Sequence, residues 1–243
     1  MGLNTKKQTF FRWSLVVYII AVHLLLVFKT DFIQRVKGKL GISVVLNDHV
    51  KNMLTYHQSM DDSVPPKAVI FLGDSITQGL ATAAIAPYAM NYGIGGENTE
   101  QLLSAIPTYK SLDRASVIFL MIGINDFGQG KEKGIIERFE KLDAALPHET
   151  PLVWSSVMPA AHPNINYTDV IPVNHAIKSL CEKRKNCTFI DTASFLLDPN
   201  GKMIPGFFTD GVHLTADGYK QWISVQKQTF QKVALASGIE SKP

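Results

Sequence analysis

A serine, a histidine and an aspartate in this sequence stand in settings that suit nucleophilic catalysis. Ser75 follows a short apolar run after one glycine and one aspartate, within the segment FLGDSITQGL at residues 71–80. A serine hydroxyl is a weak nucleophile unless an adjacent base takes its proton. His213 is the candidate base, and Asp210, three residues earlier, could accept a hydrogen bond from the other ring nitrogen and fix the tautomer. Together the three residues are of the types that an activated serine nucleophile requires.

Glycine and asparagine residues follow two further apolar runs. Gly96 lies in the segment NYGIGGENT at residues 91–99, and Asn125 lies in GIND at residues 123–126. Each of these residues also has a plainer explanation, because glycines and Asn-Asp pairs serve turns and Ser75 could simply cap a helix. Their order, each after a separate apolar run, favours a shared site over separate turns.

Four segments of the chain resemble the signature blocks of the SGNH (GDSL-type) hydrolases. These segments are Gly73-Asp74-Ser75, Gly96, Gly123-x-Asn125-Asp126 and Asp210-x-x-His213. The resemblance covers about residues 67–232 and implies a three-layer α/β/α fold that hydrolyses esters through a serine acyl-enzyme, without metal or cofactor. It further implies an oxyanion hole made by the backbone N–H groups of Ser75 and Gly96 and by the side-chain amide of Asn125. Asp74 is expected to support the turn and is given no catalytic role.

The elements that must position these residues alternate along the chain. Short apolar runs predict strands at residues 67–72, 88–92, 115–122, 152–157 and 187–191, with helical periodicity between them. This alternation predicts an α/β fold, a three-layer α/β/α sandwich around a five-stranded parallel sheet, whose ligands bind at the carboxyl ends of the strands. Asn98 and Gln101 predict a capping box, and Thr215 predicts the cap of the last helix.

The N-terminal part of the chain has a different composition from the rest. Residues 1–40 hold seven Lys/Arg and one Asp, so the remainder is net negative although the whole chain carries +3. This distribution argues against a nucleic-acid-binding face on the body. The uncharged run at residues 13–28 predicts a membrane anchor within residues 1–29, a cleaved signal peptide being the alternative. Residues 30–66 are expected to form a stalk with a short helix, and residues 67–243 the hydrolase domain.

Two cysteines indicate the cellular compartment in which the catalytic domain lies. Cys181 and Cys187 could close a small loop as a disulfide in an oxidising environment, or they could be two unrelated core residues. The disulfide, together with the anchor, predicts a membrane-anchored protein whose catalytic domain lies outside the cytoplasm. Neither cysteine has His or Cys neighbours at metal-ligand spacing, so a metal site is not expected.

The substrate follows less directly from the sequence. The soluble part leaves no stretch long enough for a lid domain, which predicts a shallow, open cleft suited to short acyl groups, such as acetyl esters on a polysaccharide. The loop at residues 158–167 is predicted to select substrate through His162, Asn164 and Tyr167, or else merely to link strand and helix. Three alternatives stay open: a lysophospholipase or thioesterase acting on membrane-derived esters, acyl transfer to another alcohol, and a catalytically silent glycan-binding or scaffolding protein.

Overall fold

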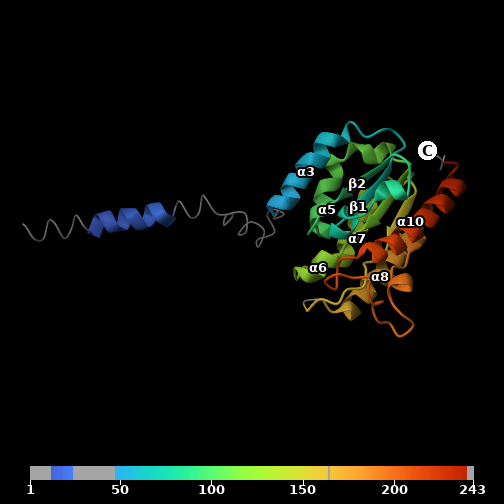
Figure 1. Cartoon of the computed structure of the whole chain (residues 1–243). Helices are drawn as coiled ribbons and strands as arrows, with labels where there is room; N and C mark the ends of the chain where they lie inside the picture. The colour runs from blue at the N-terminus through green and yellow to red at the C-terminus, as the bar shows by residue number, and fades with distance from the viewer. Residues whose placement is uncertain (1–11, 24–46, 164, 240–243) are drawn as a thin grey trace, which may run out of the picture. The chain divides into compact units, whose positions relative to one another are not determined.

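The computed structural model describes residues 12–23, 47–163 and 165–239, and Figure 1 shows the course of the chain. The chain divides into two units, Met1–Val45 and Leu46–Pro243. In the first unit, residues 12–23 form a helix. None of the helices in the described ranges has the length and apolar character needed to cross a membrane. The predicted anchor extends beyond residue 23 into positions outside those ranges, and it stays a prediction.

The second unit is built around a parallel sheet of five strands in the order β2-β1-β3-β4-β5. The strands are β1 (Val69–Gly73), β2 (Ala89–Gly93), β3 (Val117–Met121), β4 (Leu152–Ser155) and β5 (Cys187–Ile190). Gly73, the last residue of β1, pairs with Gly93 of β2 and Met121 of β3, so these three strands end at the same level. The predicted five-stranded parallel sheet is confirmed.

Helices cover both faces of the sheet. One face packs against α3 (Asp48–Asp61), α5 (Thr99–Ala105), α7 (Ile135–Ala145) and α8 (Tyr167–Lys183); the other packs against α10 (Ala216–Ser237) and the short α9 (Ala193–Leu196). Side chains alternate along a strand, so Ile70 and Leu72 of β1 enter the first core and Val69 and Phe71 enter the second. Both faces of β1 are therefore buried, which is why its sequence is a continuous apolar run.

Several short helices connect the main layers. They are α4 (Ser75–Gln78), α6 (Ile124–Gly128) and the 3₁₀ turns η1 (Thr82–Ala84), η2 (Ile106–Thr108) and η3 (Lys110–Arg114).

The predicted capping box is present at α5, where the Asn98 N–H donates to Gln101 Oε1 and the Gln101 N–H donates to Asn98 Oδ1, each at 3.1 Å. The predicted cap of α10 is also present, because Thr215 Oγ1 accepts from the Gly218 N–H at 3.2 Å. Local polar side chains thus set where these helices begin.

Helix α3 belongs to the hydrolase unit, and this differs from the predicted stalk at residues 30–66. Val50 and Leu54 are buried in the same core as the strand residue Tyr92. The Tyr92 hydroxyl donates to Asp61 Oδ1 at 2.7 Å, which fastens the end of the helix to the sheet. The observed boundary therefore lies at Leu46 and not at residue 67. The sequence concealed this packing because most residues of α3 are polar and only a narrow stripe is buried.

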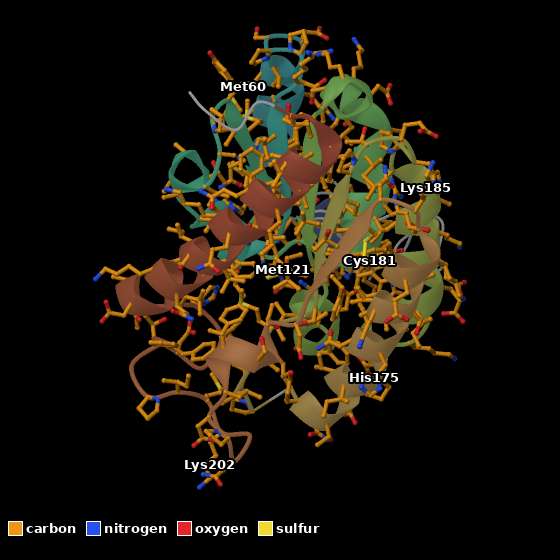
Figure 2. The ribbon with its side chains drawn as sticks, turned by 90° about the vertical axis from the view of Figure 1, so that its right-hand side faces the viewer. Met60, Met121, His175, Cys181, Lys185 and Lys202 are labelled. Atoms are coloured by element: carbon orange, nitrogen blue, oxygen red, sulfur yellow. A yellow bond between two sulfur atoms is a disulfide. The ribbon has the colours of Figure 1, made fainter. Side chains whose placement is uncertain are left out.

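A disulfide joins Cys181 near the end of α8 to Cys187 at the start of β5, with 5.2 Å between their Cα atoms (Figure 2). The bond closes the short loop between these two elements. The predicted pairing of the two cysteines is thus the one found in the structure.

Candidate active site

Ser75 lies where β1 passes into α4, at the carboxyl edge of the sheet. The strand ends at Gly73, and Asp74 caps the helix by accepting the Ile76 N–H on its Oδ1 at 3.0 Å. Ser75 is therefore the first residue of a one-turn helix and remains partly exposed. Asp74 supports the turn, as the sequence predicted.

Ser75, His213 and Asp210 form a continuous chain of hydrogen bonds. The distance from Ser75 Oγ to His213 Nε2 is 2.8 Å, and His213 Nδ1 lies 2.7 Å from Asp210 Oδ2. An ionised carboxylate only accepts hydrogen bonds, so Nδ1 of the imidazole carries the proton and Nε2 is free to accept from the serine hydroxyl. This is the tautomer that a general base for Ser75 requires.

Asp210 is held ionised by the donors around it. Its Oδ1 accepts the backbone N–H of His213 at 2.8 Å and that of Val212 at 3.0 Å. The His213 backbone N–H, followed by the His213 side chain, lowers the pKa of Asp210 far below its ordinary value. A permanent negative charge beside His213 stabilises the imidazolium that forms when the histidine takes a proton.

A tight loop before α10 brings Asp210 and His213 together. The Thr209 N–H donates to the His213 carbonyl oxygen at 2.8 Å, closing the loop. Gly211 has φ +85°, and a Cβ there would lie 2.2 Å from the carbonyl oxygen of Ala161. Only glycine fits this position. The Ala161 N–H in turn donates to the Gly211 carbonyl oxygen at 2.7 Å, so the loop at residues 158–167 lies against the catalytic loop.

The three predicted oxyanion donors come from adjacent strands. Ser75 follows β1, while Gly96 and Asn125 follow β2 and β3, the two neighbours of β1. In the part of the chain that the structure describes, the N–H groups of Ser75 and Gly96 donate to no acceptor. Asn125 Nδ2 donates to the Glu97 carbonyl oxygen at 2.9 Å, which orients the amide and leaves its second N–H for an incoming oxygen. This arrangement can stabilise negative charge on a tetrahedral intermediate.

Polar side chains hold the turn formed by Gly95 and Gly96, the glycine turn, and the start of α5 that follows it. Asp126 is fully buried and accepts the Thr99 N–H at 3.0 Å and the Thr99 hydroxyl at 2.6 Å. Arg138 of α7 donates to the same carboxylate at 3.1 Å. Gln129 Nε2 donates to the Gly96 carbonyl oxygen at 2.9 Å. Asp126 belongs to a recognised segment, but no periodicity or spacing signals Arg138 or Gln129.

Two further carboxyl groups are buried close to the site and differ from Asp210. Burial raises the pKa of Asp74 to about 7, against the lowering effect of the Ile76 N–H. Burial, followed by the nearby Asp74, raises the pKa of Glu97 well above its ordinary value. Within the described residues, neither carboxyl oxygen of Glu97 has a hydrogen-bond partner. Both groups are therefore stabilised in their neutral forms at mildly acidic pH.

The three residues predicted to select substrate lie in different surroundings. Asn164 lies outside the described residues. His162 is exposed in the loop that contacts Gly211 through Ala161. Tyr167 begins α8 and packs against the first core, where burial raises the pKa of its hydroxyl. The position of Tyr167 favours a structural role for it, and substrate selection by this loop stays a prediction.

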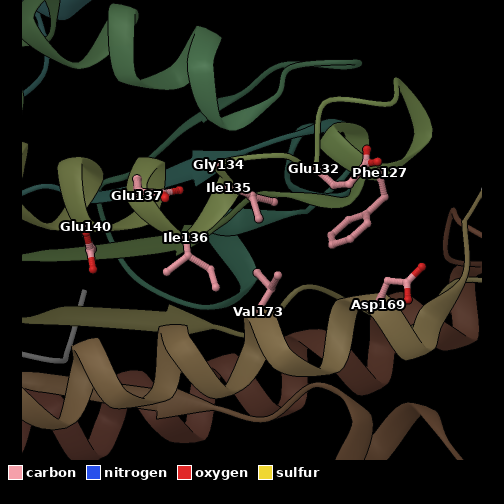
Figure 3. Close-up of a pocket in the computed structure, with 9 residues that line it drawn as sticks. All are labelled: Phe127, Glu132, Gly134, Ile135, Ile136, Glu137, Glu140, Asp169 and Val173. Carbon is pink, nitrogen blue, oxygen red and sulfur yellow. The ribbon is translucent and has the colours of Figure 1, made fainter.

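A separate pocket of about 480 Å³ lies between α7 and α8 and has an acidic rim (Figure 3). Its carboxylates are Glu132, Glu137, Glu140 and Asp169. The pocket contains none of the predicted site residues. Across the described ranges, no group of three or more His, Cys, Asp or Glu side chains is arranged to hold a metal ion.

A comparison with known proteins found a matching family. Residues 71–221 match the GDSL-like lipase/acylhydrolase family. Among characterised proteins, the chain is similar to the human platelet-activating factor acetylhydrolase IB subunit alpha1. The two are 24% identical over 178 residues, which cover 69% of this chain and 77% of the relative.

Solved structures share the fold. A GDSL-like lipase from Bacteroides thetaiotaomicron superposes with a TM-score of 0.60 and 20% identity, covering 74% of this chain and 97% of that one. An acetyl xylan esterase from Geobacillus stearothermophilus superposes with a TM-score of 0.54 and 18% identity, covering 69% and 94%. The matched family segment begins in β1 and ends in α10, so it includes the serine, glycine, asparagine and histidine segments described above.

Proposed function

The chain belongs to the GDSL-like lipase/acylhydrolase family of carboxylic ester hydrolases, and we propose that it removes acetyl or other short acyl groups from a carbohydrate through an ester on Ser75. The observation that carries the mechanism is the hydrogen-bonded chain from Ser75 through His213 to Asp210. Membership of the family accounts for ester hydrolysis, and our proposal adds the short acyl group and the carbohydrate alcohol.

The first half of the reaction acylates the serine. Ser75 Oγ attacks the ester carbonyl carbon while His213 Nε2 takes the hydroxyl proton, forming a tetrahedral intermediate. The negative oxygen of this intermediate accepts hydrogen bonds from the N–H groups of Ser75 and Gly96 and from the Asn125 amide. When the intermediate collapses, the alcohol leaves with the proton from His213, and the acyl group stays on Ser75.

The second half regenerates the enzyme. Water attacks the acyl carbon, and His213 takes its proton as it took the serine proton before. Collapse of the second tetrahedral intermediate releases the carboxylic acid and returns the proton to Ser75. Asp210 keeps the imidazole in one tautomer and orientation throughout. If another alcohol replaces water, the same steps give acyl transfer.

The exposure of the site supports a small acyl group on a large alcohol. The side chains of His213 and Asp210 are 46% and 57% exposed, so the catalytic histidine lies at an open rim and not at the bottom of a tunnel. A long acyl chain needs apolar surface to leave water, whereas an acetyl group does not. The names of the human relative and of the Geobacillus structure both specify acetyl esters, although they differ in the molecule that carries the acetyl group.

The N-terminal sequence supports a second candidate, a lysophospholipase or thioesterase. The uncharged run at residues 13–28 would hold the catalytic unit near lipid if it anchors the protein. We propose the same anchor, with the disulfide-bonded catalytic unit outside the cytoplasm, for either substrate class.

Product analysis distinguishes these functions. The full-length protein is incubated with acetylated polysaccharides, with acetyl and long-chain acyl esters of one alcohol, and with lysophospholipids, using Ser75→Ala as the control. We expect acetate release that requires Ser75 and activity that falls as the acyl chain lengthens. A rise in activity with chain length would favour the lysophospholipase or thioesterase, and equal activity in Ser75→Ala would overturn the acyl-enzyme mechanism.

A further inference from the structure

The amino end of α3 lies against the glycine turn that supplies the predicted oxyanion donor. A Cβ built on Gly95 would lie 3.2 Å from His49 Nε2, and one built on Gly96 would lie 3.7 Å from Asn47 Nδ2. Asn47 is fixed as the helix cap because its Oδ1 accepts the Val50 N–H at 2.9 Å. Helix α3 lies outside the segment that matches the family, residues 71–221. This contact is therefore a feature of this chain that the family comparison does not supply.

Gln78 links this helix end to the turn. Its Oε1 accepts the Gly95 N–H and lies 3.3 Å from His49 Nε2. Because the Gly95 N–H can only donate, the Gln78 atom facing it must be the carbonyl oxygen. That oxygen cannot donate, so His49 bonds to it only when Nε2 carries the proton. With the proton on Nε2, His49 and Gly95 donate to a single acceptor and hold it from two sides.

The same link connects the turn to the nucleophile. Gln78 is the last residue of α4, three positions after Ser75, so both side chains lie on one side of this single turn. The Gly95 N–H is taken up by Gln78, while the following N–H, that of Gly96, donates to no acceptor in the described part of the chain. Gln78 holds the peptide before Gly95, while Gln129 holds the Gly96 carbonyl oxygen and the Glu97 N–H donates to the Ile94 carbonyl oxygen at 3.1 Å, so the peptide between Gly95 and Gly96 is restrained from both sides. We propose that His49 is a positioning residue that acts through Gln78 to aim the Gly96 N–H at the oxyanion.

This inference rests on the proposed ester hydrolysis, and it predicts a specific kinetic signature. Loss of the His49 donor frees Gln78 and loosens the turn, which weakens the oxyanion hole in the transition state and leaves ground-state binding unchanged. His49→Ala should therefore lower kcat roughly three- to tenfold, the worth of about one hydrogen bond, with little change in KM. His49→Gln, whose amide can donate, should recover most of the loss, and His49→Phe should not.

The experiment uses the full-length protein and two readouts. One is turnover of 4-nitrophenyl acetate, and the other is the rate at which a fluorophosphonate modifies Ser75, since its phosphoryl oxygen occupies the same hole. The matched control is Lys51→Ala, an exposed position on the same helix. His49→Ala should slow both reactions, and adding it to Gln78→Ala should have no further effect, because the two residues act in series.

The possible results distinguish a failure of the positioning role of His49 from a failure of ester hydrolysis through Ser75. If the wild type is modified at Ser75 and His49→Ala reacts at the wild-type rate, the positioning role is overturned and the proposed function stands. Additive effects of His49→Ala and Gln78→Ala would also overturn it, as would an equal loss in Lys51→Ala. A wild type that is neither modified at Ser75 nor active on the ester overturns both.

Discussion

The carboxyl groups around the nucleophile differ in charge because their surroundings differ. Asp210 is exposed and accepts two backbone N–H groups, so it stays ionised beside His213. Asp74 and Glu97 are buried, with 1% and 0% of their surfaces exposed, so burial favours their neutral forms. An additional negative charge behind the oxyanion hole would oppose the charge that develops in the transition state. The site therefore holds one charged carboxylate beside the histidine and two buried carboxyl groups whose pKa values are raised by burial.

The buried acids predict how stability changes with pH. The pKa of Asp74 rises from 3.8 to about 7 on folding, so between these values the folded chain binds more protons than the unfolded chain. The free energy of unfolding should therefore fall as the pH rises through this window, and Glu97 should extend the fall to higher pH. Glu97→Gln removes one of the two groups, and we expect a shallower fall in urea denaturation measured at several pH values.

The matched control for this prediction is Glu100→Gln. Glu100 lies three residues away, and its side chain is 45% exposed and paired with Lys131. It should keep the pH dependence of the wild type. The same slope in Glu97→Gln and in the wild type would show that Glu97 does not titrate in the folded protein as its burial implies.

Asn125 permits a direct test of the oxyanion hole. Removing one such donor typically costs about 10²–10³-fold in kcat. Asn125→Ala should show this loss, together with a small loss of stability, about 1 kcal/mol, because its bond to the Glu97 carbonyl oxygen is also lost. Steady-state kinetics and urea denaturation of the same preparation measure both effects. Asn200→Ala, in an exposed loop, serves as control, and an unchanged kcat in Asn125→Ala would remove Asn125 from the hole.

At the scale of elements, α3 is the part whose role the structure changed most. A stalk helix would tolerate substitution on all sides, whereas a core helix has one sensitive face. Leu54 is 8% exposed within the first core, and Tyr56, two residues later, is 60% exposed. Leu54→Ala should therefore lower the free energy of unfolding by about 2–5 kcal/mol. Tyr56→Ala should change it by no more than about 0.5 kcal/mol. Equal effects in the two variants would show that α3 is a solvated stalk helix and not part of the core.

The ends of three adjacent strands determine where the site residues lie. Because β2, β1 and β3 are adjacent and end at one level, three chain segments deliver Gly96, Ser75 and Asn125 to the same edge. The catalytic histidine comes from a fourth segment, the loop before α10. The Tyr219 hydroxyl of α10 donates to the Ile76 carbonyl oxygen at 2.9 Å, which ties the last helix to the helix of the nucleophile. Neighbouring strands and one interhelical bond thus assemble a site whose parts are far apart in sequence.

At the scale of the whole molecule, we expect membrane binding and esterase activity to belong to different units of the chain. The catalytic residues all belong to the unit Leu46–Pro243, and the proposed anchor belongs to the other. The full chain should float with lipid vesicles, and a chain starting at Leu46 should stay in the aqueous fraction, with both hydrolysing a water-soluble acetyl ester at similar rates. Flotation followed by esterase assay of each fraction measures this. A full chain that stays with the aqueous fraction would contradict the anchor.

The sequence by itself determined the fold class and singled out Ser75, His213 and Asp210, which the structure joins by hydrogen bonds. Short apolar runs bounded by glycine are read directly as buried parallel strands, and such strands must end at a common edge. Ser75, Gly96, Asn125, Asp210 and His213 could be selected in advance because each lies in a short segment of recognisable type after or before such an element. The caps at Asn98 and Thr215 were predictable for the same reason, since capping is a contact between residues three positions apart.

Only the tertiary structure decided which residues support that site. Gln78 of α4 and Gln129, which follows α6, bond to the backbone of Gly95 and Gly96. His49 of α3 lies 3.3 Å from Gln78 Oε1, and Arg138 of α7 donates to Thr99 Oγ1 at 2.7 Å. No local pattern in the sequence marks such contacts. The place of α3 was hidden for a related reason, because a mostly polar helix with a narrow buried stripe looks like a solvated one until its partner surface is known. The burial of Glu97 could not be predicted from the sequence either. The pKa of a carboxyl group depends on the atoms that surround it in the folded chain and not on its neighbours in sequence.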